Sequence, residues 1–316
     1  MTQHIMILCP VLNDGGSLIM LQKNLDEVLK KINDARFSFL IVDDGSSPPL
    51  KLNNTSSFTT HVLHLKRNIG HQKALAIGFA YIRQHLPCDK VLVMDSDGED
   101  KPEDALALLN GANAHPGKII FANRKSRQEG TQFRFFYLLY KILFYLLTGR
   151  KISFGHFLVL PYNSLDNLVH YSEIWNHIPG AILKSGLPYA TIETHRGKRY
   201  AGKSKMNFTS LLLHGLGAIA VFIDVIAARL LIFSIGMISL ALLAILVITY
   251  IRIFTDLAIP GWASTVVSSL LIVLLQSFLL SLFTIFLYLS SQSQRKFIPA
   301  HHYQDYTGTV ETLTHV

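Results

Sequence analysis

The segment Val91-Leu92-Val93-Met94-Asp95-Ser96-Asp97 indicates the fold class of this chain. Its four apolar residues, bounded by polar ones, predict a short buried β-strand. Two carboxylates follow, two positions apart, where that strand would end. Short apolar runs that alternate with helical patterns are typical of a mostly parallel α/β sheet, and ligands bind such sheets beyond the carboxyl ends of the strands. The segment therefore predicts a fold class and the edge of the sheet that carries the site.

Similar apolar runs recur on both sides of this segment, and apolar residues at helical spacing lie between them. The predicted helices are Ser17–Ile32, with Ser17 near its N-cap, and Gln72–His85, and a further helix begins at Lys101-Pro102-Glu103. The predicted strands are His4–Val11, Phe37–Val42, His61–Leu65, Val91–Met94 and Lys118–Ala122.

Polar residues follow four of these strands. Because the carboxyl ends of parallel strands meet at one edge, we expect the four groups to lie together. An Asp-x-Asp pair there offers hard oxygen ligands that suit Mg²⁺ or Mn²⁺ and leave positions for diphosphate oxygens. The four groups are Asn13-Asp14, Asp43-Asp44, Asp95–Asp97 and Asn123-Arg124.

The second half of the chain has a membrane composition. Half of all 316 residues are hydrophobic, and the excess is concentrated in residues 225–290. Two uncharged stretches, 230–251 and 263–289, are each long enough to cross a hydrocarbon core of ~30 Å. Both therefore predict transmembrane helices, which the short loop Arg252–Trp262 joins as a hairpin.

Basic residues set the predicted topology. Lys203, Lys205 and Arg229 precede the first span, and Arg295-Lys296 follow the second. The positive-inside rule then places both ends in the cytoplasm, in a multi-pass protein of the inner (cytoplasmic) membrane. We expect a catalytic domain over 1–205, a juxtamembrane amphipathic helix over 206–229 and a polar, poorly ordered cytoplasmic tail over 290–316.

The region near 133–148 is rich in aromatic and aliphatic residues and is too short to span a bilayer. It predicts a helix that lies at the membrane interface, with a buried core helix as the alternative.

Composition disfavours several other classes. The formal charge of +8 lies mainly beside the hydrophobic segments and not in an aromatic-interleaved stripe, which favours lipid headgroups over nucleic acid. Only Cys9 and Cys88 occur, so there is no disulfide framework. No Gly-x-Gly-x-x-Gly or phosphate-loop motif of a dehydrogenase or kinase appears.

Five polar motifs follow one another along the chain: Pro10-Val11-Leu12-Asn13-Asp14, Val42-Asp43-Asp44-Gly45-Ser46, Arg67-Asn68-Ile69-Gly70-His71, Asp95-Ser96-Asp97-Gly98-Glu99-Asp100-Lys101-Pro102-Glu103 and Arg199-Tyr200-Ala201-Gly202-Lys203-Ser204-Lys205. In this order they resemble the motifs of glycosyltransferase family 2. The fifth matches the Arg-x-x-Gly-x-Ser-Lys segment of its polyprenyl-phosphate branch, which includes dolichyl-phosphate mannose synthase and bactoprenol glucosyltransferases. The resemblance covers residues 4–290 and implies the nucleotide-diphospho-sugar transferase fold called GT-A.

The resemblance implies a role for each matching residue. The nucleotide-sugar contacts are Pro10, Leu12, Asp14, Asp43, Asp95, Ser96 and Asp97. The ligands of Mg²⁺ or Mn²⁺ are Asp95 and Asp97, with Glu99. The phosphate-binding residues are Arg124, Arg199, Ser204 and Lys205. The catalytic set is Asp95, Asp97, Arg124, Arg199 and Lys205.

The acceptor decides whether a base is needed. A polyprenyl phosphate is an anion at neutral pH and attacks without losing a proton, whereas a hydroxyl acceptor needs a nearby base. Glu173 and His156 are the candidates for that base. The stretch Ser153–Leu158 lacks the Asp and Arg that the branch often carries there, which leaves the acceptor open.

These observations predict an inverting transferase that moves a sugar from a nucleotide to a lipid acceptor, most simply undecaprenyl phosphate, for cell-surface glycan synthesis or modification. The alternatives are transfer to a hydroxyl of a lipid-linked glycan and a non-catalytic membrane scaffold that retains the fold. A processive polysaccharide synthase is disfavoured because its Gln-x-x-Arg-Trp motif is absent. The expected partners are the donor, the acceptor and the bilayer, without nucleic acid, and a homo-oligomer stays open.

Overall fold

The computed structural model describes residues 2–32, 34–52, 57–124, 131–151, 154–201, 208–255, 261–294 and 296–314. The chain divides into two compact units. The first comprises Met1–Ile142, Lys151–Val221 and Lys296–Val316, and the second comprises Leu143–Arg150 and Phe222–Arg295. The segment that follows the apolar hairpin thus belongs to the same unit as the N-terminal region.

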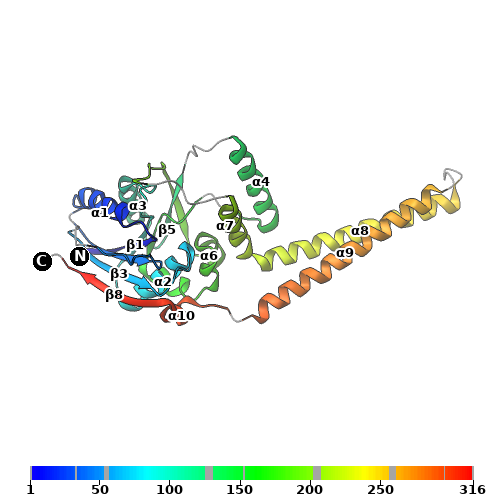
Figure 1. Ribbon diagram of the computed structural model, residues 1–316. Helices are drawn as coiled ribbons and strands as arrows, with labels where there is room; N and C mark the ends of the chain where they lie inside the picture. Colours follow the sequence, from blue (N-terminus) through cyan, green and yellow to red (C-terminus); the bar gives the residue numbers. More distant parts are fainter. Residues whose placement is uncertain are drawn as a thin grey trace. The chain divides into compact units, whose positions relative to one another are not determined.

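The first unit is built on one mixed sheet (Figure 1). The strand order is β7-β5-β6-β4-β1-β2-β3-β8. Four neighbouring pairs are parallel and three are antiparallel, which confirms the predicted mostly parallel α/β class. The strands are β1 Gln3–Val11, β2 Ala35–Asp43, β3 Thr59–Leu65, β4 Lys90–Val93, β5 Ile119–Arg124, β6 Leu158–Pro161, β7 Tyr189–Thr194 and β8 Thr307–Leu313.

The five predicted strands are all present, as β1 to β5. The prediction omitted β6, β7 and β8. Strand β6 runs antiparallel to both β4 and β5 and lies between them. Its four residues are too few to show a clear period in the sequence.

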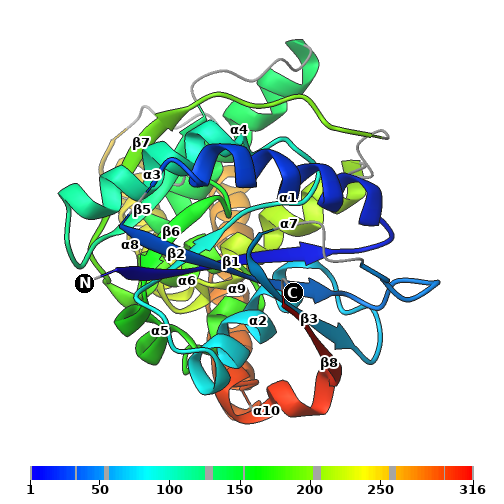
Figure 2. The ribbon, with the colours of Figure 1, turned by 90° about the vertical axis from the view of Figure 1, so that its left-hand side faces the viewer.

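Helices cover both faces of this sheet. Helices α1 (Gly15–Leu29) and α3 (Pro102–Ala114) lie on one face and α2 (His71–His85) lies on the other (Figure 2). Gly78 of α2 packs so closely that an added Cβ would lie 2.6 Å from Leu8. The neighbouring residue Ile7 instead joins the core that α1 and α3 fill. Because both faces are buried, the central strands are continuous apolar runs.

Helix α1 begins earlier than predicted, so the placement of Ser17 near the N-cap is corrected. The cap is Asp14, whose carboxylate accepts the backbone N–H of Ser17 at 3.4 Å. Ser17 lies in the first turn and is fully buried. An aspartate at the cap satisfies an amide that has no partner within the helix.

The C-terminal segment also differs from the prediction. Of the poorly ordered tail expected over 290–316, residues 290–293 end α9, and the described residues from Lys296 onward are a folded part of the first unit. Helix α10 (Pro299–Tyr306) leads into β8, which pairs antiparallel with β3. The Lys66 side chain donates to the carbonyls of Gln304 and Asp305, at 3.3 and 3.1 Å, near the end of α10. Strand β8 covers an edge of the sheet that would otherwise leave backbone groups unpaired.

The second unit contains the two apolar helices. Helices α8 (Ile223–Phe254) and α9 (Trp262–Ser293) pack side by side (Figure 1) and are each 32 residues long, exceeding the predicted spans. Both are long and apolar enough to cross a membrane, and only 11% and 6% of their most apolar windows are buried. The buried residues between 230 and 290 are small: Ser234, Ala241, Ser281 and Thr284. Small residues let two helix backbones approach closely.

Two further helices contain the other apolar segments. Helix α4 (Thr131–Thr148) coincides with the predicted interfacial helix, and its described side chains over 138–146 are mostly exposed, which disagrees with a buried core helix. The helix expected over 206–229 is divided between α7 (Phe208–Ala220) and residues 223–229, which begin α8. The remaining helices are α5 Tyr162–Leu168, the 3-10 helix η1 Ser172–Trp175 and α6 Ile178–Ser185.

The turn after β2 requires glycine. Gly45 has a φ of +73°, and a Cβ there would lie 2.5 Å from the backbone nitrogen of Asn68. We expect Gly45→Ala to lower the free energy of unfolding by about 2–3 kcal/mol, because both the backbone conformation and the contact become strained. Thermal unfolding in detergent measures this.

Gly16→Ala is the matched control, since Gly16 lies in α1 with no atom near the added Cβ. That change should be neutral or stabilising by up to about 1 kcal/mol. Equal unfolding temperatures for the two variants would contradict the contact between the β2 and β3 turns.

Candidate active site at the carboxyl edge of the sheet

The turn after β4 is closed by its own carboxylates. The backbone N–H of Asp95 donates to Asp100 at 3.0 Å, and that of Glu99 donates to Asp97 at 2.9 Å. Gly98 has a φ of +88°, and a Cβ there would lie 2.8 Å from the Tyr200 ring. The turn therefore needs glycine and places its acidic residues beyond the end of a central strand.

Two arginines from the segment after β7 bind this turn. Arg196 donates to both oxygens of Glu99, at 3.0 and 2.7 Å. Arg199 donates to Glu99 at 2.8 Å and pairs with Asp97 at 2.9 Å. Backbone bonds hold the same segment, because the Tyr200 N–H donates to the Asp97 carbonyl at 2.9 Å. The two segments thus form one charged cluster.

A third arginine comes from the neighbouring strand. Arg124, the last residue of β5, donates to the buried carboxylate of Asp100 at 2.8 Å. It also lies 3.6 Å from Glu99. The three arginines together offset most of the negative charge of the turn.

The carboxylates of the turn differ in how easily they ionise. Burial and the charge of Asp97 raise the pKa of Asp95 to about 7. Burial and the charge of Asp95 likewise raise the pKa of Asp100 to about 7. Burial also acts to raise the pKa of Glu99, but the hydrogen bonds from its two arginines lower it below its ordinary value. A cation bound near Asp95 would relieve the repulsion between these charges.

The residues predicted to hold a metal divide into two groups. Asp95 has a side chain that is 37% exposed, and Nε2 of His71 lies 3.5 Å from its Oδ1. Asp97 lies beside it at the same rim. Glu99, expected as a third ligand, instead uses both oxygens to accept from arginine. Asp95 fits a hard cation, whose other ligands would be water and diphosphate oxygens. Asp97 would join it only on releasing Arg199, because its carboxylate accepts the Glu99 N–H and pairs with Arg199.

The described part of the chain contains no cluster of three or more His, Cys, Asp or Glu residues that could hold a metal ion. Proteins usually bind Mg²⁺ through one or two carboxylates, and substrate phosphates and water complete the coordination. A metal here would therefore depend on the donor for part of its coordination.

The residues predicted to contact the nucleoside lie at the ends of β1 and β2. Pro10 is buried and Leu12 is half-buried, while Asp14 caps α1. Asp43 is 2% exposed. Its carboxylate accepts the backbone N–H of Ser46 at 3.0 Å and contacts His64 Nδ1 at 2.8 Å.

These contacts change the chemistry of Asp43. Burial acts to raise its pKa, but the hydrogen bonds from Ser46 and His64 produce a net shift below its ordinary value. An ionised, internally bonded aspartate shapes the turn around the predicted nucleoside site. Its neighbour Asp44 does the same for the next turn, accepting the backbone N–H groups of Ile69 and Gly70 at 2.8 and 3.0 Å.

One candidate base lies near the acidic turn. The ring of His156 is 5.2 Å from that of His71, the residue that faces Asp95. Gln72 contacts Nε2 of His156, and its amide oxygen accepts the backbone N–H of Ile178 at 2.9 Å. Because that second bond orients the amide, the Gln72 NH₂ group donates to His156. Nε2 of His156 is then already an acceptor.

The other candidate base, Glu173, has its own partners. Lys184 lies 3.1 Å from its carboxylate, and the Ser172 hydroxyl donates to it, also at 3.1 Å. Burial acts to raise its pKa, but these contacts lower it below its ordinary value. A carboxylate held ionised by a lysine is a weak base for a hydroxyl group.

Three residues that the sequence predicted for the site remain: Ser96, Ser204 and Lys205. Ser96 is 7% exposed and lies within the acidic turn. Ser204 and Lys205 lie outside the described residues.

Sequence reasoning assigned no role to three residues of the cluster. Asp100 was visible only as part of the acidic run, Arg196 only as a basic residue close to Arg199, and His71 only as the end of a motif.

A mostly parallel sheet that presents an Asp-x-Asp turn and arginines at its carboxyl edge defines a nucleotide-sugar transferase of the GT-A type. Residues 7–172, just over half of the chain, match the family described as Glycosyl transferase family 2. The chain belongs to that family, and it is a glycosyltransferase.

Relatives agree with this assignment. The chain is 26% identical over 283 residues to the uncharacterized glycosyltransferase YkcC of Bacillus subtilis (strain 168), covering 86% of this chain and 85% of YkcC. It is 25% identical over 234 residues to the uncharacterized glycosyltransferase YkoT of the same organism, covering 68% and 66%. Among solved structures, mannosyl-3-phosphoglycerate synthase from Rubrobacter xylanophilus shares the fold with a TM-score of 0.50 and 15% identity, covering 69% of this chain and 72% of that one.

The arginine cluster should contribute to stability. Glu99→Gln leaves Arg196 and Arg199 without their shared carboxylate, so we expect the free energy of unfolding to fall by about 2 kcal/mol. Glu103→Gln is the control, because Glu103 is exposed in the first turn of α3. Thermal unfolding at neutral pH compares the two, and equal stability would refute a structural role for Glu99.

Proposed function

We propose that this protein is a metal-dependent inverting glycosyltransferase that moves a sugar from a nucleotide-sugar donor to a polyprenyl phosphate, undecaprenyl phosphate being the simplest case, at the membrane surface for cell-surface glycan synthesis or modification. The observation that carries the acceptor assignment is that both candidate bases, Glu173 and His156, are engaged by internal partners. A phosphate acceptor needs neither of them, because it is already an anion.

The proposed binding of the nucleotide-sugar donor is supported by the acidic turn. Asp95 and Asp97 would hold Mg²⁺ or Mn²⁺ together with the diphosphate. When bound, the cation supplies positive charge that stabilises the leaving nucleoside diphosphate. Arg199 already spans this turn and could move its guanidinium to a phosphate within the same cluster. Arg124 is a further candidate partner for phosphate. Ser204 and Lys205, which follow Arg199 in the sequence, are two more.

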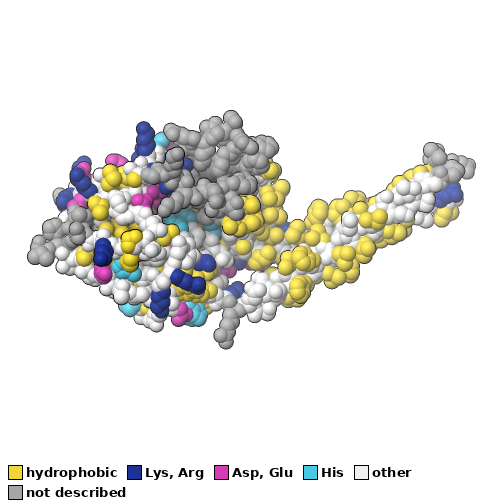
Figure 3. Space-filling model, in the orientation of Figure 1, with side chains coloured by type: hydrophobic (Ala, Val, Ile, Leu, Met, Phe, Trp, Pro, Cys, Tyr) yellow, Lys and Arg dark blue, Asp and Glu magenta, His cyan; other side chains and the backbone are white. Residues whose placement is uncertain are grey.

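The proposed membrane location and orientation are supported by the hairpin and by the sheet. Helices α8 and α9 expose apolar side chains along most of their length (Figure 3). The chain before the hairpin and the chain after it contribute strands to one sheet, since β8 pairs with β3. A hairpin that spans a bilayer must therefore return to the side on which it started. Together with the basic residues around both spans, this supports a cytoplasmic catalytic unit and C-terminus.

A hydroxyl acceptor is the second candidate, and one observation favours it. His156 lies beside His71, which itself faces Asp95. Release of Gln72 from His156 would provide a base near the reacting groups. The acceptor test below distinguishes the two reactions, and a scaffold without activity is its third outcome.

The reaction is tested by incubating the purified full chain with radiolabelled nucleotide sugars and undecaprenyl phosphate, with and without Mn²⁺ or Mg²⁺. We expect a metal-dependent labelled lipid from one donor. Donor hydrolysis without a lipid product would favour the hydroxyl acceptor. Metal-dependent nucleotide binding without any turnover would favour the scaffold.

Asp97→Asn should lower this turnover about 100-fold or more, because it removes charge where the leaving group develops its own. Asp166→Asn is the matched control: Asp166 is 52% exposed in α5. Its activity should equal that of the parent protein. Full activity of Asp97→Asn would refute the assignment of Asp97 as a metal ligand.

Membrane attachment has its own test. Replacing residues 223–294 with a Gly/Ser linker removes the hairpin and keeps α10 and β8, which the sheet needs. We expect the variant to leave the membrane fraction and stay folded. Sedimentation and circular dichroism measure both. If the folded variant still pellets with membranes, the exposed apolar side chains of α4 and α7 suffice for attachment.

A further inference from the structure

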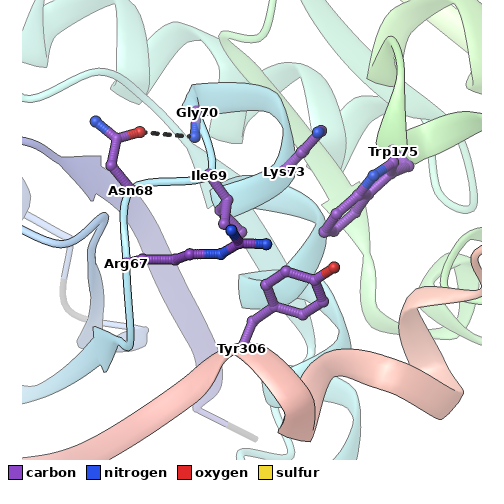
Figure 4. A pocket seen from close by; sticks show the side chains of 7 residues that line it. All are labelled: Arg67, Asn68, Ile69, Gly70, Lys73, Trp175 and Tyr306. Carbon is purple, nitrogen blue, oxygen red and sulfur yellow. Dashed lines mark hydrogen bonds between the residues drawn. The ribbon is translucent and has the colours of Figure 1, made fainter.

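A second polar cavity lies at the turn between β3 and α2. Its volume is about 430 Å³, and three segments far apart in the sequence form it: the β3–α2 turn with the start of α2, the 3-10 helix η1 and the end of α10 (Figure 4). The lining residues are Arg67, Asn68, Ile69, Gly70, Lys73, Trp175 and Tyr306. None of them is acidic, and none belongs to the acidic turn of the active site.

Two cations of this cavity have no carboxylate partner. The Arg67 guanidinium lies over the Tyr306 ring, 6.0 Å from its centroid, and the Lys73 ammonium lies 5.2 Å from the Trp175 ring (Figure 4). Within the described ranges of the chain, no acidic side chain forms an ion pair with either residue. Both cations are therefore available to an anionic ligand. The positive end of the α2 dipole adds to their potential.

The turn that carries Arg67 is held in place by the neighbouring strand. Asp44, at the end of β2, accepts the backbone N–H groups of Ile69 and Gly70 at 2.8 and 3.0 Å. The Asn68 side chain accepts the Gly70 N–H as well, at 3.0 Å. This part of the cavity is thus formed before any ligand binds, which lowers the entropy cost of binding.

The aromatic side of the cavity is also packed. The Trp175 ring lies 3.8 Å from that of Phe297 and 5.4 Å from that of Tyr306, between centroids. The backbone N–H of Lys66 donates to the Tyr306 carbonyl at 2.9 Å, which fixes the end of α10 beside the turn. The C-terminal segment therefore supplies a wall of this cavity as well as an edge strand.

We propose that this cavity binds a phosphate ester, with the phosphate between Arg67 and Lys73 and the organic part against Trp175 and Tyr306. Guanidinium and ammonium groups are the side chains that recognise phosphate, and aromatic faces accept sugar or base rings. The same chemistry is found in soluble phosphate esters and in lipid headgroups. Residues 67–70 also belong to the third family motif, but no lining residue belongs to the acidic turn. The binding test below uses neither donor nor metal, so the two proposals can fail independently.

Binding is tested with the full chain in detergent and ³²P-labelled inorganic pyrophosphate, by equilibrium dialysis in EDTA. The chelator removes the metal on which donor binding at the acidic turn would depend. We expect saturable binding that weakens at least tenfold in Arg67→Gln/Lys73→Gln, since each cation contributes charged hydrogen bonds. Lys118→Gln, at an exposed lysine before β5, is the control and should bind like the parent protein.

A second arm tests the lipid source. The chain has two tryptophans, so Trp262→Phe leaves Trp175 as the only fluorescent reporter in the cavity. In this background, nanodiscs of phosphatidylcholine are compared with nanodiscs that also contain phosphatidic acid. A Trp175 response to phosphatidic acid alone identifies a lipid headgroup, and pyrophosphate binding in the first arm identifies a soluble phosphate ligand.

The aromatic wall is tested by a matched pair at Tyr306. Tyr306→Phe keeps the ring under Arg67 and should bind with an affinity within about twofold of the parent, whereas Tyr306→Ala should weaken binding severalfold. The proposal is overturned if neither arm gives a response, or if the response persists in Arg67→Gln/Lys73→Gln.

Discussion

The active-site edge depends on the charge balance of one short turn. Four carboxylates lie within six residues after β4, and such a density of negative charge needs compensation from elsewhere in the fold. Arg124 from β5 and two arginines from the segment after β7 provide it. The strand order brings these segments to one side of the turn, with β6 between β4 and β5. The site is therefore a product of the sheet topology, and Asp95, the acid with the weakest internal partner, is the one left for a ligand.

A second constraint is the return of the chain after the apolar hairpin. Strand β8 pairs with β3, so the C-terminal segment covers the β3 edge of the sheet. One pairing thus has three consequences. It restricts a spanning hairpin to one membrane side for both ends, it covers an exposed edge, and it places Tyr306 beside Arg67. The first unit is incomplete without the residues that follow the apolar hairpin.

The residues that match the family also form the turns at the carboxyl edge of the sheet. Membership of glycosyltransferase family 2 rests on residues 7–172, which include the turns after β1, β2, β3 and β4. Asp44 joins the turn after β2 to the turn after β3, and the Ser46 hydroxyl, which accepts the Asn13 N–H, joins it to the turn after β1. The segment after β7 lies outside that match and contributes Arg196 and Arg199. The charged cluster thus combines residues of the family match with two arginines that lie outside it.

The sequence by itself determined the elements and their class. Apolar runs located β1 to β5, helical spacing located α1 and α2, and long uncharged stretches located α8 and α9, because each of these signals is local. The sequence also located Asp95, Asp97, Arg124 and Arg199 as members of one site. Only the tertiary structure decided how the charges pair. Glu99 binds arginines, Gln72 occupies His156, and the polar C-terminus becomes β8. Such pairings join residues far apart in the chain, and their free energy depends on a geometry that no local pattern contains.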